Sequence, residues 1–303
     1  MSESYVVDVK HLTKSFTSQV VVDDVSLRIK QGEIFGFLGA NGSGKTTTIR
    51  MICGLLTPDN AQGHCLGYDL VKEAREIKKQ VGYMPQRFSL YSDLSVYENL
   101  KFMGQIYEVV DMSEKIEKVM HILQLHDKQH QLAEALSGGW KQRLAFAACL
   151  IHEPKLLLLD EPTAGIDPLA RRVFWDLIHA LSESGVTTLV STHYIDEAER
   201  CNHLAYLDHG KLLVSGSISA VISATQMYAF SLKGSFSSKL LSDLQALNTV
   251  IQAAWFGEHI HVCTYQPDLF LQQVQDLHCE YNFQIVASEP SLEDAFIALG
   301  AQR

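Results

Sequence analysis

Apolar and polar residues alternate along the first part of the chain, over residues 5–16 and again over residues 20–29. An alternation with a period of two predicts β-strands that each bury one face. A third strand is expected over residues 33–40, and Gln31-Gly32 before it predicts a hairpin turn between the second and third strands. The stretch "NGSGKTTTIRMICGLL" then predicts a glycine loop followed by a helix.

The pattern becomes helical between about residues 89 and 152. Two continuous apolar runs come next, "KLLLLDEP" and "VTTLVST", with a helical segment over residues 168–185 between them. Such runs are typical of strands that are buried on both faces of a parallel sheet. Strands that alternate with helices predict an α/β core, and residues 89–152 predict a helical insert within it.

The pattern changes again after about residue 225. The expected elements are a strand over 227–234, a helix over 238–247, a hairpin over 251–265, a helix over 268–281, a strand over 283–288 and a helix over 291–299. This order predicts a small α+β domain. We therefore expect two domains, residues 1–225 with the helical insert and residues 226–303.

The composition is that of an ordinary globular protein, with 47% hydrophobic and 20% charged residues. The formal net charge of -10 argues against non-specific binding to nucleic acid, which favours a basic surface. Six scattered cysteines, with no closely spaced pair, fit a reducing compartment. No apolar run approaches the ~20 residues that cross a bilayer, and the N-terminus does not resemble a signal peptide. A protein located in the cytoplasm is expected.

Residues Gly39–Thr46, "GANGSGKT", follow a strand and open a helix in the pattern of a phosphate-binding loop. Its glycines allow backbone N–H groups to surround an anion, and the helix N-terminus adds positive potential. Lys45 is expected to reach the β- and γ-phosphates, and the Thr46 hydroxyl to bind Mg²⁺. The expected nucleotide-binding residues here are Gly39, Asn41, Gly42, Ser43, Gly44, Lys45, Thr46 and Thr47. The alternative is a plain glycine turn.

Asp160 and Glu161 end the buried run "LLLLDE". Ligands of open α/β sheets bind at the carboxyl ends of the strands. Asp160 is expected to hold Mg²⁺, directly or through water, and Glu161 to orient and deprotonate an attacking water. The alternative is a solvated acidic loop. With the phosphate-binding loop, these acids predict a P-loop NTPase that uses Mg²⁺.

Further short motifs indicate which class of P-loop NTPase the chain resembles. In chain order they are "MPQ", "LSGGWKQR", "LLLLDEP", "AGIDP" and "STHY". This set resembles the ATP-binding subunit of an ABC transporter over about the first 225 residues. The resemblance implies a RecA-like P-loop core with an N-terminal antiparallel β subdomain, the helical insert and ATPase activity.

The resemblance also implies roles for single residues. Phe16 matches an aromatic that stacks on adenine, an interaction of ~1–3 kcal/mol, although it could be an ordinary core residue. Gln86 matches a glutamine that binds Mg²⁺ and water, and His193 a switch histidine that contacts the γ-phosphate. Asp167 matches an aspartate that crosses to a second subunit. The segment "RFSLYSDLSVYENL" matches the surface that grips the membrane subunit.

The "LSGGW" motif places two glycines in front of a helix, which is a second anion site. One chain is not expected to bring it to its own phosphate-binding loop, because the insert separates them. We therefore expect a homodimer in which Ser137, Gly138 and Gly139 of one copy cover the ATP held by Lys45 of the other. Trp140 stands where the family usually has Gln, and its position against the insert or beside the nucleotide is open.

Several motifs, including "VGYMPQ", "STHYIDEAERC" and "SLEDAFIAL", resemble the ATPases of ABC-2-type exporters, and "LSGGWKQRLA" resembles a group of multidrug efflux ATPases. The implied partners are ABC-2-type permeases, which would attach the chain to the inner membrane. Two alternatives remain: a soluble ABC ATPase that acts on the ribosome or DNA, and a small-molecule kinase. The first usually has two ATP sites, zinc cysteines or coiled coils, and the second does not explain "LSGGW" and "STHY".

Overall fold

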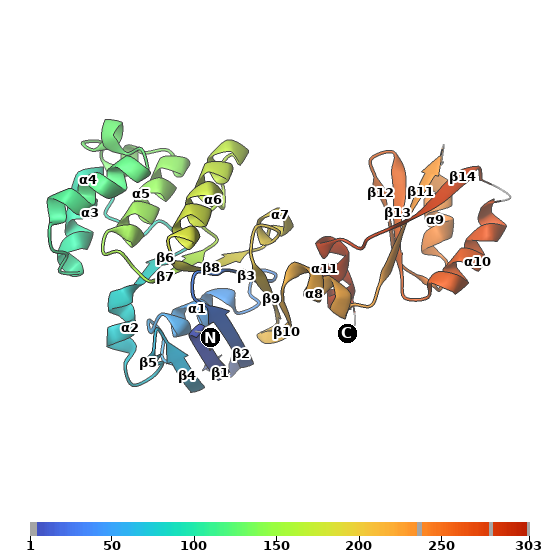
Figure 1. Ribbon diagram of the computed structural model, residues 1–303, viewed down its shortest axis with the longest axis horizontal. Helices are drawn as coiled ribbons and strands as arrows, with labels where there is room; N and C mark the ends of the chain where they lie inside the picture. The colour runs from blue at the N-terminus through green and yellow to red at the C-terminus, as the bar shows by residue number, and fades with distance from the viewer. Residues whose placement is uncertain (1–4, 235–237, 279–280, 302–303) are drawn as a thin grey trace. The chain divides into compact units, whose positions relative to one another are not determined.

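The computed structural model describes residues 5–234, 238–278 and 281–301. The chain divides into two compact units, Met1–Ser215 and Gly216–Arg303 (Figure 1). The sequence places this boundary after residue 225. It falls earlier in the structure because α8 (Ile218–Ala224) packs against α11 (Leu292–Ala301) within the second unit.

The first unit contains a four-stranded antiparallel sheet in the order β2-β1-β4-β5. Its strands are β1 (Tyr5–Phe16), β2 (Gln19–Lys30), β4 (Asn60–Cys65) and β5 (Tyr68–Asp69). Val7, Val9, Val25 and Ile29 lie at alternate positions and are buried, as the alternation in the sequence predicts. The two short strands were not predicted, because "NAQGHC" has few apolar residues.

A six-stranded sheet forms the centre of this unit, in the order β10-β9-β3-β8-β7-β6. Its strands are β3 (Ile34–Leu38), β6 (Val81–Met84), β7 (Leu156–Asp160), β8 (Thr187–Thr192), β9 (His203–Asp208) and β10 (Lys211–Gly216). The pairs β3–β8, β3–β9, β7–β8 and β6–β7 are parallel. Every residue of β3, β7 and β8 is buried, as expected for strands covered on both faces.

The hairpin predicted at Gln31 and Gly32 is wrong. These residues do form a turn, but β2 and β3 belong to different sheets. Ile34–Leu38 is apolar at consecutive positions, so the strand buries both faces in the parallel sheet instead of continuing the half-exposed antiparallel one.

Helices cover both faces of the six-stranded sheet. Helix α1 (Lys45–Ile52) contacts β1, β2 and β7, and Figure 1 shows it between the two sheets. On the other face, α6 (Pro168–Glu183) and α7 (Ile195–Ala198) contact β3 and β8. Helix α2 (Ala74–Gln80) leads directly into β6. The core between the two sheets includes Phe37, Ile49 and Leu158.

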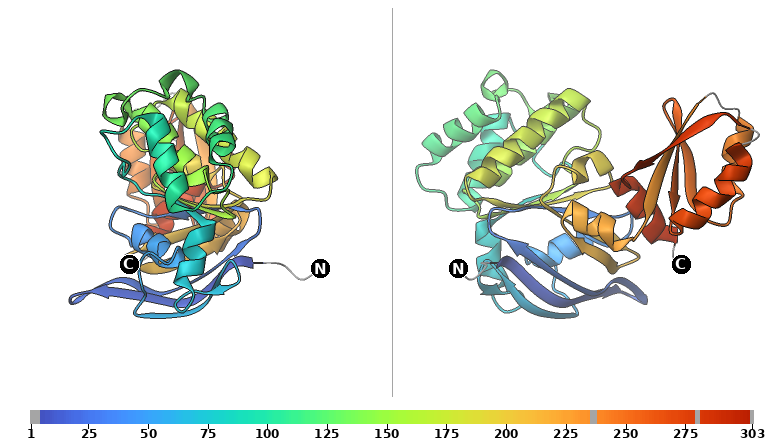
Figure 2. Two further views of the ribbon diagram at one scale, coloured as in Figure 1. Left: turned by 90° about the vertical axis from the view of Figure 1, so that its left-hand side faces the viewer. Right: turned by 45° about the vertical axis from the view of Figure 1, so that its right-hand side comes forward.

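Three helices pack together as the predicted insert: α3 (Val96–Ile106), α4 (Met112–Ile122) and α5 (Gly138–Leu150). Two 3₁₀ turns, His126–Lys128 and Ala133–Ala135, connect the last two. Helix α3 begins with a capping box, in which Ser95 accepts from the Glu98 N–H and Glu98 accepts from the Ser95 N–H. Figure 2 shows this helical layer from two further sides.

The second unit has a four-stranded antiparallel sheet in the order β12-β13-β11-β14. Its elements besides α8 and α11 are β11 (Tyr228–Gly234), α9 (Ser238–Gln245), β12 (Val250–Phe256), β13 (His259–Thr264), α10 (Pro267–His278) and β14 (Phe283–Ser288). Residues of α9 and α10 join the apolar core on one face of the sheet. A second cluster contains Ala229 and Cys263 with Ala295 and Ala298 of α11. The antiparallel β12–β13 pair confirms the predicted hairpin.

Five cysteines lie in the described part of the chain, and all five are free and buried. This confirms that they behave as small apolar residues. Cys279 lies outside the described residues. Among the described residues, no helix combines the length and apolar character needed to cross a membrane.

Candidate functional site

The glycine-rich loop between β3 and α1 is built from positions that only glycine fits. Gly39 has φ +154°, and a Cβ there would lie 2.1 Å from the carbonyl oxygen of Leu207. Gly44 has φ +102°, and a Cβ there would lie 2.6 Å from the carbonyl oxygen of Val21. The loop can therefore close tightly on the core while its backbone N–H groups stay available.

Lys45 opens α1 and is buried below the loop, with 5% of its surface exposed. Its Nζ donates to the carbonyl oxygens of Gly39 at 2.7 Å and Ala40 at 3.0 Å. Burial lowers the pKa of Lys45, while the charges of Glu161 and Asp160 oppose this shift. A buried cation at a helix N-terminus is a favourable position for an anion.

The Ser43 hydroxyl gives independent evidence for a ligand at this loop. Its Oγ is buried and has no hydrogen-bond partner among the described residues. A buried polar atom without a partner costs free energy, so native proteins normally pair it. A phosphate oxygen bound in the loop would supply that partner.

Asp160 links the loop to the end of the parallel sheet. Its Oδ2 accepts from Thr46 Oγ1 at 2.7 Å, and its Oδ1 accepts from Ser191 Oγ at 2.6 Å. The second bond follows from the sheet register, which pairs Asp160 of β7 with Ser191 of β8. A carboxylate beside a hydroxyl provides the hard oxygen ligands that Mg²⁺ prefers.

Glu161 is the point at which separate segments of the chain meet. Gln86 Nε2 donates to Glu161 Oε2 at 2.9 Å, and His193 Nδ1 lies 3.4 Å from the same oxygen. Glu161 has φ +49°, a conformation that is uncommon for residues other than glycine. Its N–H donates to Ser191 Oγ at 3.0 Å, which helps to hold the carboxylate in place.

A pocket of about 310 Å³ lies over these groups. Its lining residues are Val21, Asn41, Gly42, Gly44, Lys45, Thr46, Thr47, Gln86 and Glu161. All except Val21 are residues that the sequence analysis assigns to the site. Residues separated by more than a hundred positions along the chain thus share one polar pocket.

Phe16 and Asp167, both expected at the site, do not line this pocket. Phe16, at the end of β1, is 46% exposed and is absent from the pocket lining. Lys14 Nζ lies 5.8 Å from the centroid of its ring. Asp167 is the N-cap of α6, where its Oδ1 accepts from the N–H groups of Leu169 at 3.1 Å and Ala170 at 3.0 Å. That carboxylate has a helix-capping role in this chain.

Ser137, Gly138 and Gly139 begin α5 and do not line the pocket. Ser137 makes no side-chain capping bond, although serine at this position usually does. A Cβ added at Gly138 or Gly139 would meet no described heavy atom within 4 Å. The surface over these three residues is therefore open, and their backbone can be approached closely.

Trp140 contacts two basic residues of the helical insert. The Arg143 guanidinium lies 4.9 Å from the centroid of the Trp140 ring, and Lys128 Nζ lies 6.0 Å from it. These cation–π contacts hold the indole on the insert.

Two groups beside the site were missed from the sequence. Ser191 Oγ donates to Asp160 Oδ1 and accepts from the Glu161 N–H, and Ser191 is fully buried. Glu197, also fully buried, accepts from Thr163 Oγ1 and from Thr192 Oγ1 at 2.7 Å, and Arg171 Nε lies 3.4 Å away. Polar residues inside the apolar run "VTTLVST" were the available signal, because a buried hydroxyl requires a partner.

Comparison with known proteins identifies the family of the chain. A sequence profile of the family described as "ABC transporter" matches residues 22–164. The chain is 44% identical over 214 residues to the "Probable multidrug ABC transporter ATP-binding protein YbhF" of Escherichia coli. That alignment covers 70% of this chain but only 37% of the E. coli protein.

The "Nod factor export ATP-binding protein I" of Rhizobium sp. is similar over nearly the whole chain. It is 33% identical over 297 residues, which cover 97% of this chain and 96% of the Rhizobium protein. The chain therefore belongs to the ATP-binding subunits of ABC transporters, the ABC ATPases, and its relatives include exporter subunits.

Solved structures agree with the fold. An "ATP binding subunit of ABC transporter" superposes with a TM-score of 0.67 at 28% identity, over 72% of this chain and 92% of that one. An ATP-binding cassette in a dimeric, post-hydrolysis state with ADP and phosphate gives 0.66 at 26% identity, over 70% of this chain and 98% of that one. The predicted α/β P-loop fold is thus confirmed.

Proposed function

We propose that this chain binds and hydrolyses ATP as a subunit of an ABC-2-type exporter and drives efflux through separate membrane permeases. The observation that carries the proposal is the convergence of Gln86 and His193 on the Glu161 carboxylate, beside a phosphate-binding loop. The motif order and the exporter relatives support the transport role.

In the proposed site, the loop of residues 39–47 binds the triphosphate of ATP, and the charge of Lys45 within it attracts the phosphates. Mg²⁺, held by Thr46, Asp160 and Gln86, would neutralise charge that develops on the phosphates. Glu161 accepts the proton of the attacking water, oriented by Gln86, and His193 contacts the γ-phosphate. Phe16 is proposed to stack on adenine, and its exposure at the end of β1 is compatible with that role.

Two copies of the chain are proposed to share each nucleotide. The pocket over Lys45 receives no residue from the start of α5, whereas Ser137, Gly138 and Gly139 present an open helix N-terminus. A head-to-tail pair with two-fold symmetry brings each of these N-termini to the phosphates held by the other copy. Asp167 then lies at the interface, next to the capped end of α6.

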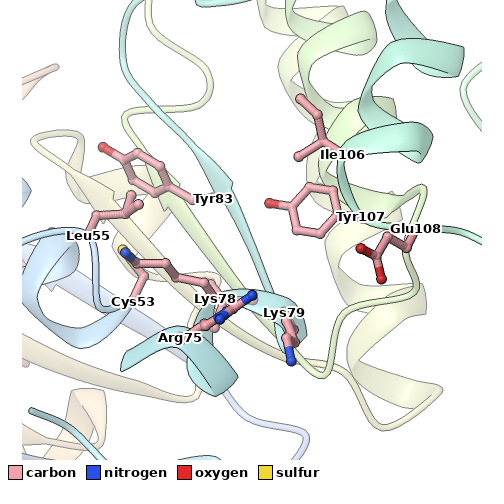
Figure 3. Close-up of a pocket in the computed structure, with 10 residues that line it drawn as sticks. Cys53, Leu55, Arg75, Lys78, Lys79, Tyr83, Ile106, Tyr107 and Glu108 are labelled. Carbon is pink, nitrogen blue, oxygen red and sulfur yellow. The ribbon is translucent and has the colours of Figure 1, made fainter. Parts of the chain in front are cut away.

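A groove lies between α2 and the helical insert (Figure 3), and it is proposed to receive the permease. Its lining contains none of residues 87–100, the segment that the resemblance assigns to this contact, so the groove would extend the proposed permease surface beyond that segment. Its volume is about 560 Å³, and its lining residues are Cys53, Leu55, Arg75, Lys78, Lys79, Val81, Tyr83, Ile106, Tyr107 and Glu108. Exposed apolar side chains on both walls and three cations along α2 favour a helix that carries apolar residues and an acidic group.

This groove is also connected to the reaction site. Tyr83 and Val81 belong to β6, and Gln86 follows two residues after that strand ends. Gln86 donates a hydrogen bond to Glu161. A permease helix that moves in the groove can therefore shift Gln86 and, through it, the Glu161 carboxylate. The chain is proposed to sit at the cytoplasmic face of the inner membrane, attached through its permease, as the exporter relatives suggest.

Replacement of Glu161 by Gln tests the proposed reaction. The amide keeps the size of the side chain but cannot accept a proton, so hydrolysis should fall about 10²–10⁴-fold while ATP affinity stays near that of the wild type. Phosphate release and nucleotide affinity measure the two effects. Glu183→Gln, at the exposed end of α6, serves as the control and should keep wild-type turnover. Hydrolysis by Glu161→Gln within a few-fold of the wild type would refute the assignment of the base.

A further inference from the structure

The second unit contains a group of metal-ligand side chains that the transport function does not use. His261 Nε2, Cys263 Sγ and a carboxylate oxygen of Asp294 all lie within 4.8 Å of one another. Among the residues that the structure describes, this is the one group of three such side chains with that geometry. We propose that it binds a zinc-type transition metal ion.

The distances within the group approach those of a metal site. His261 Nε2 lies 2.9 Å from Asp294 Oδ2 and 3.4 Å from Cys263 Sγ. Zinc bonds of ~2.0–2.3 Å to nitrogen, oxygen and sulfur, at tetrahedral angles, put such ligand atoms about 3.3–3.6 Å apart. The two distances from His261 Nε2 are no longer than these, so the side chains would move apart to admit an ion.

The ligands come from rigid elements. His261 and Cys263 are two residues apart on β13, so both point to the same face of the sheet, and β13 lies between β12 and β11. Asp294 lies in the first turn of α11. Its Oδ2 also accepts from the Ser291 N–H at 2.7 Å and Ser291 Oγ at 2.8 Å, which fixes the orientation of the carboxylate.

The residues paired with the ligands on the sheet differ in size. Cys263 is paired with Ala229 and Gln252, and His261 with Ser231 and Ala254. The centroid of the Phe256 ring lies 5.8 Å from that of His261. Three protein ligands would leave the fourth position of a tetrahedral zinc site to a water molecule.

A catalytic Cys-His-Asp arrangement is a poorer explanation. In such a triad the histidine uses one ring nitrogen for the nucleophile and the other for the carboxylate. Here the same nitrogen, His261 Nε2, faces both Cys263 and Asp294. With Nε2 facing both side chains, the imidazole cannot pass a proton from the thiol to the carboxylate through its two nitrogens. The arrangement fits three ligands around one ion better.

The donor set also limits the choice of ion. One imidazole, one thiol and one carboxylate suit Zn²⁺ or Co²⁺ better than Mg²⁺ or Ca²⁺, which prefer oxygen ligands alone. A bound ion would join α11 to the centre of the sheet. Its role is therefore to stabilise the second unit, as metal binding to the folded state does.

The test uses the full chain, stripped of metal with a chelator and free of nucleotide. Titration with Co²⁺ should give equimolar binding with a thiolate-to-metal charge-transfer band. Titration with Zn²⁺ should raise Tm by about 5 °C at a hundredfold excess over Kd. Cys263→Ser, which removes the thiolate, should abolish the band, and both Cys263→Ser and His261→Gln should weaken binding about tenfold or more.

His259→Ala is the matched control, because His259 lies on the same strand outside the group. It should bind Co²⁺ as the wild type does. Absence of equimolar binding, a spectrum without the thiolate band, or unchanged binding by a folded Cys263→Ser variant would overturn the proposal. Each of those results would leave His261 and Asp294 as a hydrogen-bonded pair that supports the cap of α11.

Discussion

Lys45 already makes two hydrogen bonds with its own chain, so its third donor and its charge are what it can offer a nucleotide. We predict that Lys45→Ala weakens ATP binding itself, by about tenfold or more, because it removes the buried cation next to the phosphates. Isothermal titration with ATP under magnesium measures the affinity.

Lys72→Ala is a suitable control for this change, since Lys72 is an exposed lysine of the same unit. Wild-type affinity is expected for it. If Lys45→Ala bound ATP as tightly as Lys72→Ala but only turned over more slowly, Lys45 would act in the reaction and not in binding.

The sequence predicted those site residues whose position depends on the backbone of one continuous segment. Gly39 and Lys45 belong to a continuous motif, and their geometry follows from the turn between a strand and a helix. Ser191 was missed because its bond to Asp160 depends on the pairing of two strands that are thirty-one positions apart at those residues. No local pattern reports such a pairing.

Elements were predicted where their apolar pattern was strong. The buried strands β7 and β8 are continuous apolar runs, and the apolar residues of α3 and α4 have helical spacing. Helix α8 and strand β4 were missed, because "ISAVISA" and "NAQGHC" are short and carry weak patterns. The β2–β3 connection was predicted wrongly, since a Gln-Gly turn fits both a hairpin and a change of sheet.

The junction between the helical insert and β6 has a pH-sensitive residue. His152 Nε2 lies 3.2 Å from the Val81 carbonyl oxygen, and its ring stacks on Tyr107 with a centroid separation of 3.8 Å. Burial lowers the pKa of His152 to about 4. Its Nδ1 is buried without a partner among the described residues, so a second proton there would have no acceptor.

Because the pKa of His152 is lower in the folded state than its ordinary value of 6.5, its contribution to stability is complete above pH 6.5. That contribution falls as the pH drops towards 4, since the unfolded chain takes up the proton first. We predict that the wild type loses about 2–3 kcal/mol more stability between pH 7.5 and 4.5 than His152→Gln does. Urea unfolding at the two pH values measures this, and equal losses would contradict it.

On the scale of the whole molecule, the residues proposed to bind ATP all lie in the first unit. We predict that a chain ending at Gly216 folds and binds ATP, because the two sheets and the insert form their core without residues of the second unit. Circular dichroism and ATP titration test this. Loss of ATP binding by a truncated chain that is folded would show that the second unit completes the site.

The proposed dimer predicts that ATP holds two copies of the chain together and that a change at the start of α5 prevents this. In a Glu161→Gln background, ATP is bound but not consumed, so it should hold two copies together. Ser137→Arg places a large cation at the open N-terminus of α5, which lies outside the chain's own pocket. The double variant should therefore bind ATP but remain a monomer in size-exclusion chromatography with light scattering.

Ser184→Arg in the same background is the control, because Ser184 is an exposed serine at the opposite end of α6 from Asp167. It should form ATP-dependent dimers as Glu161→Gln does. Dimers of the Ser137→Arg variant with the same ATP dependence would show that α5 does not cover a partner's nucleotide. If Glu161→Gln itself stays monomeric, the same comparison is made with the permease present, because a membrane partner raises the local concentration of the two copies.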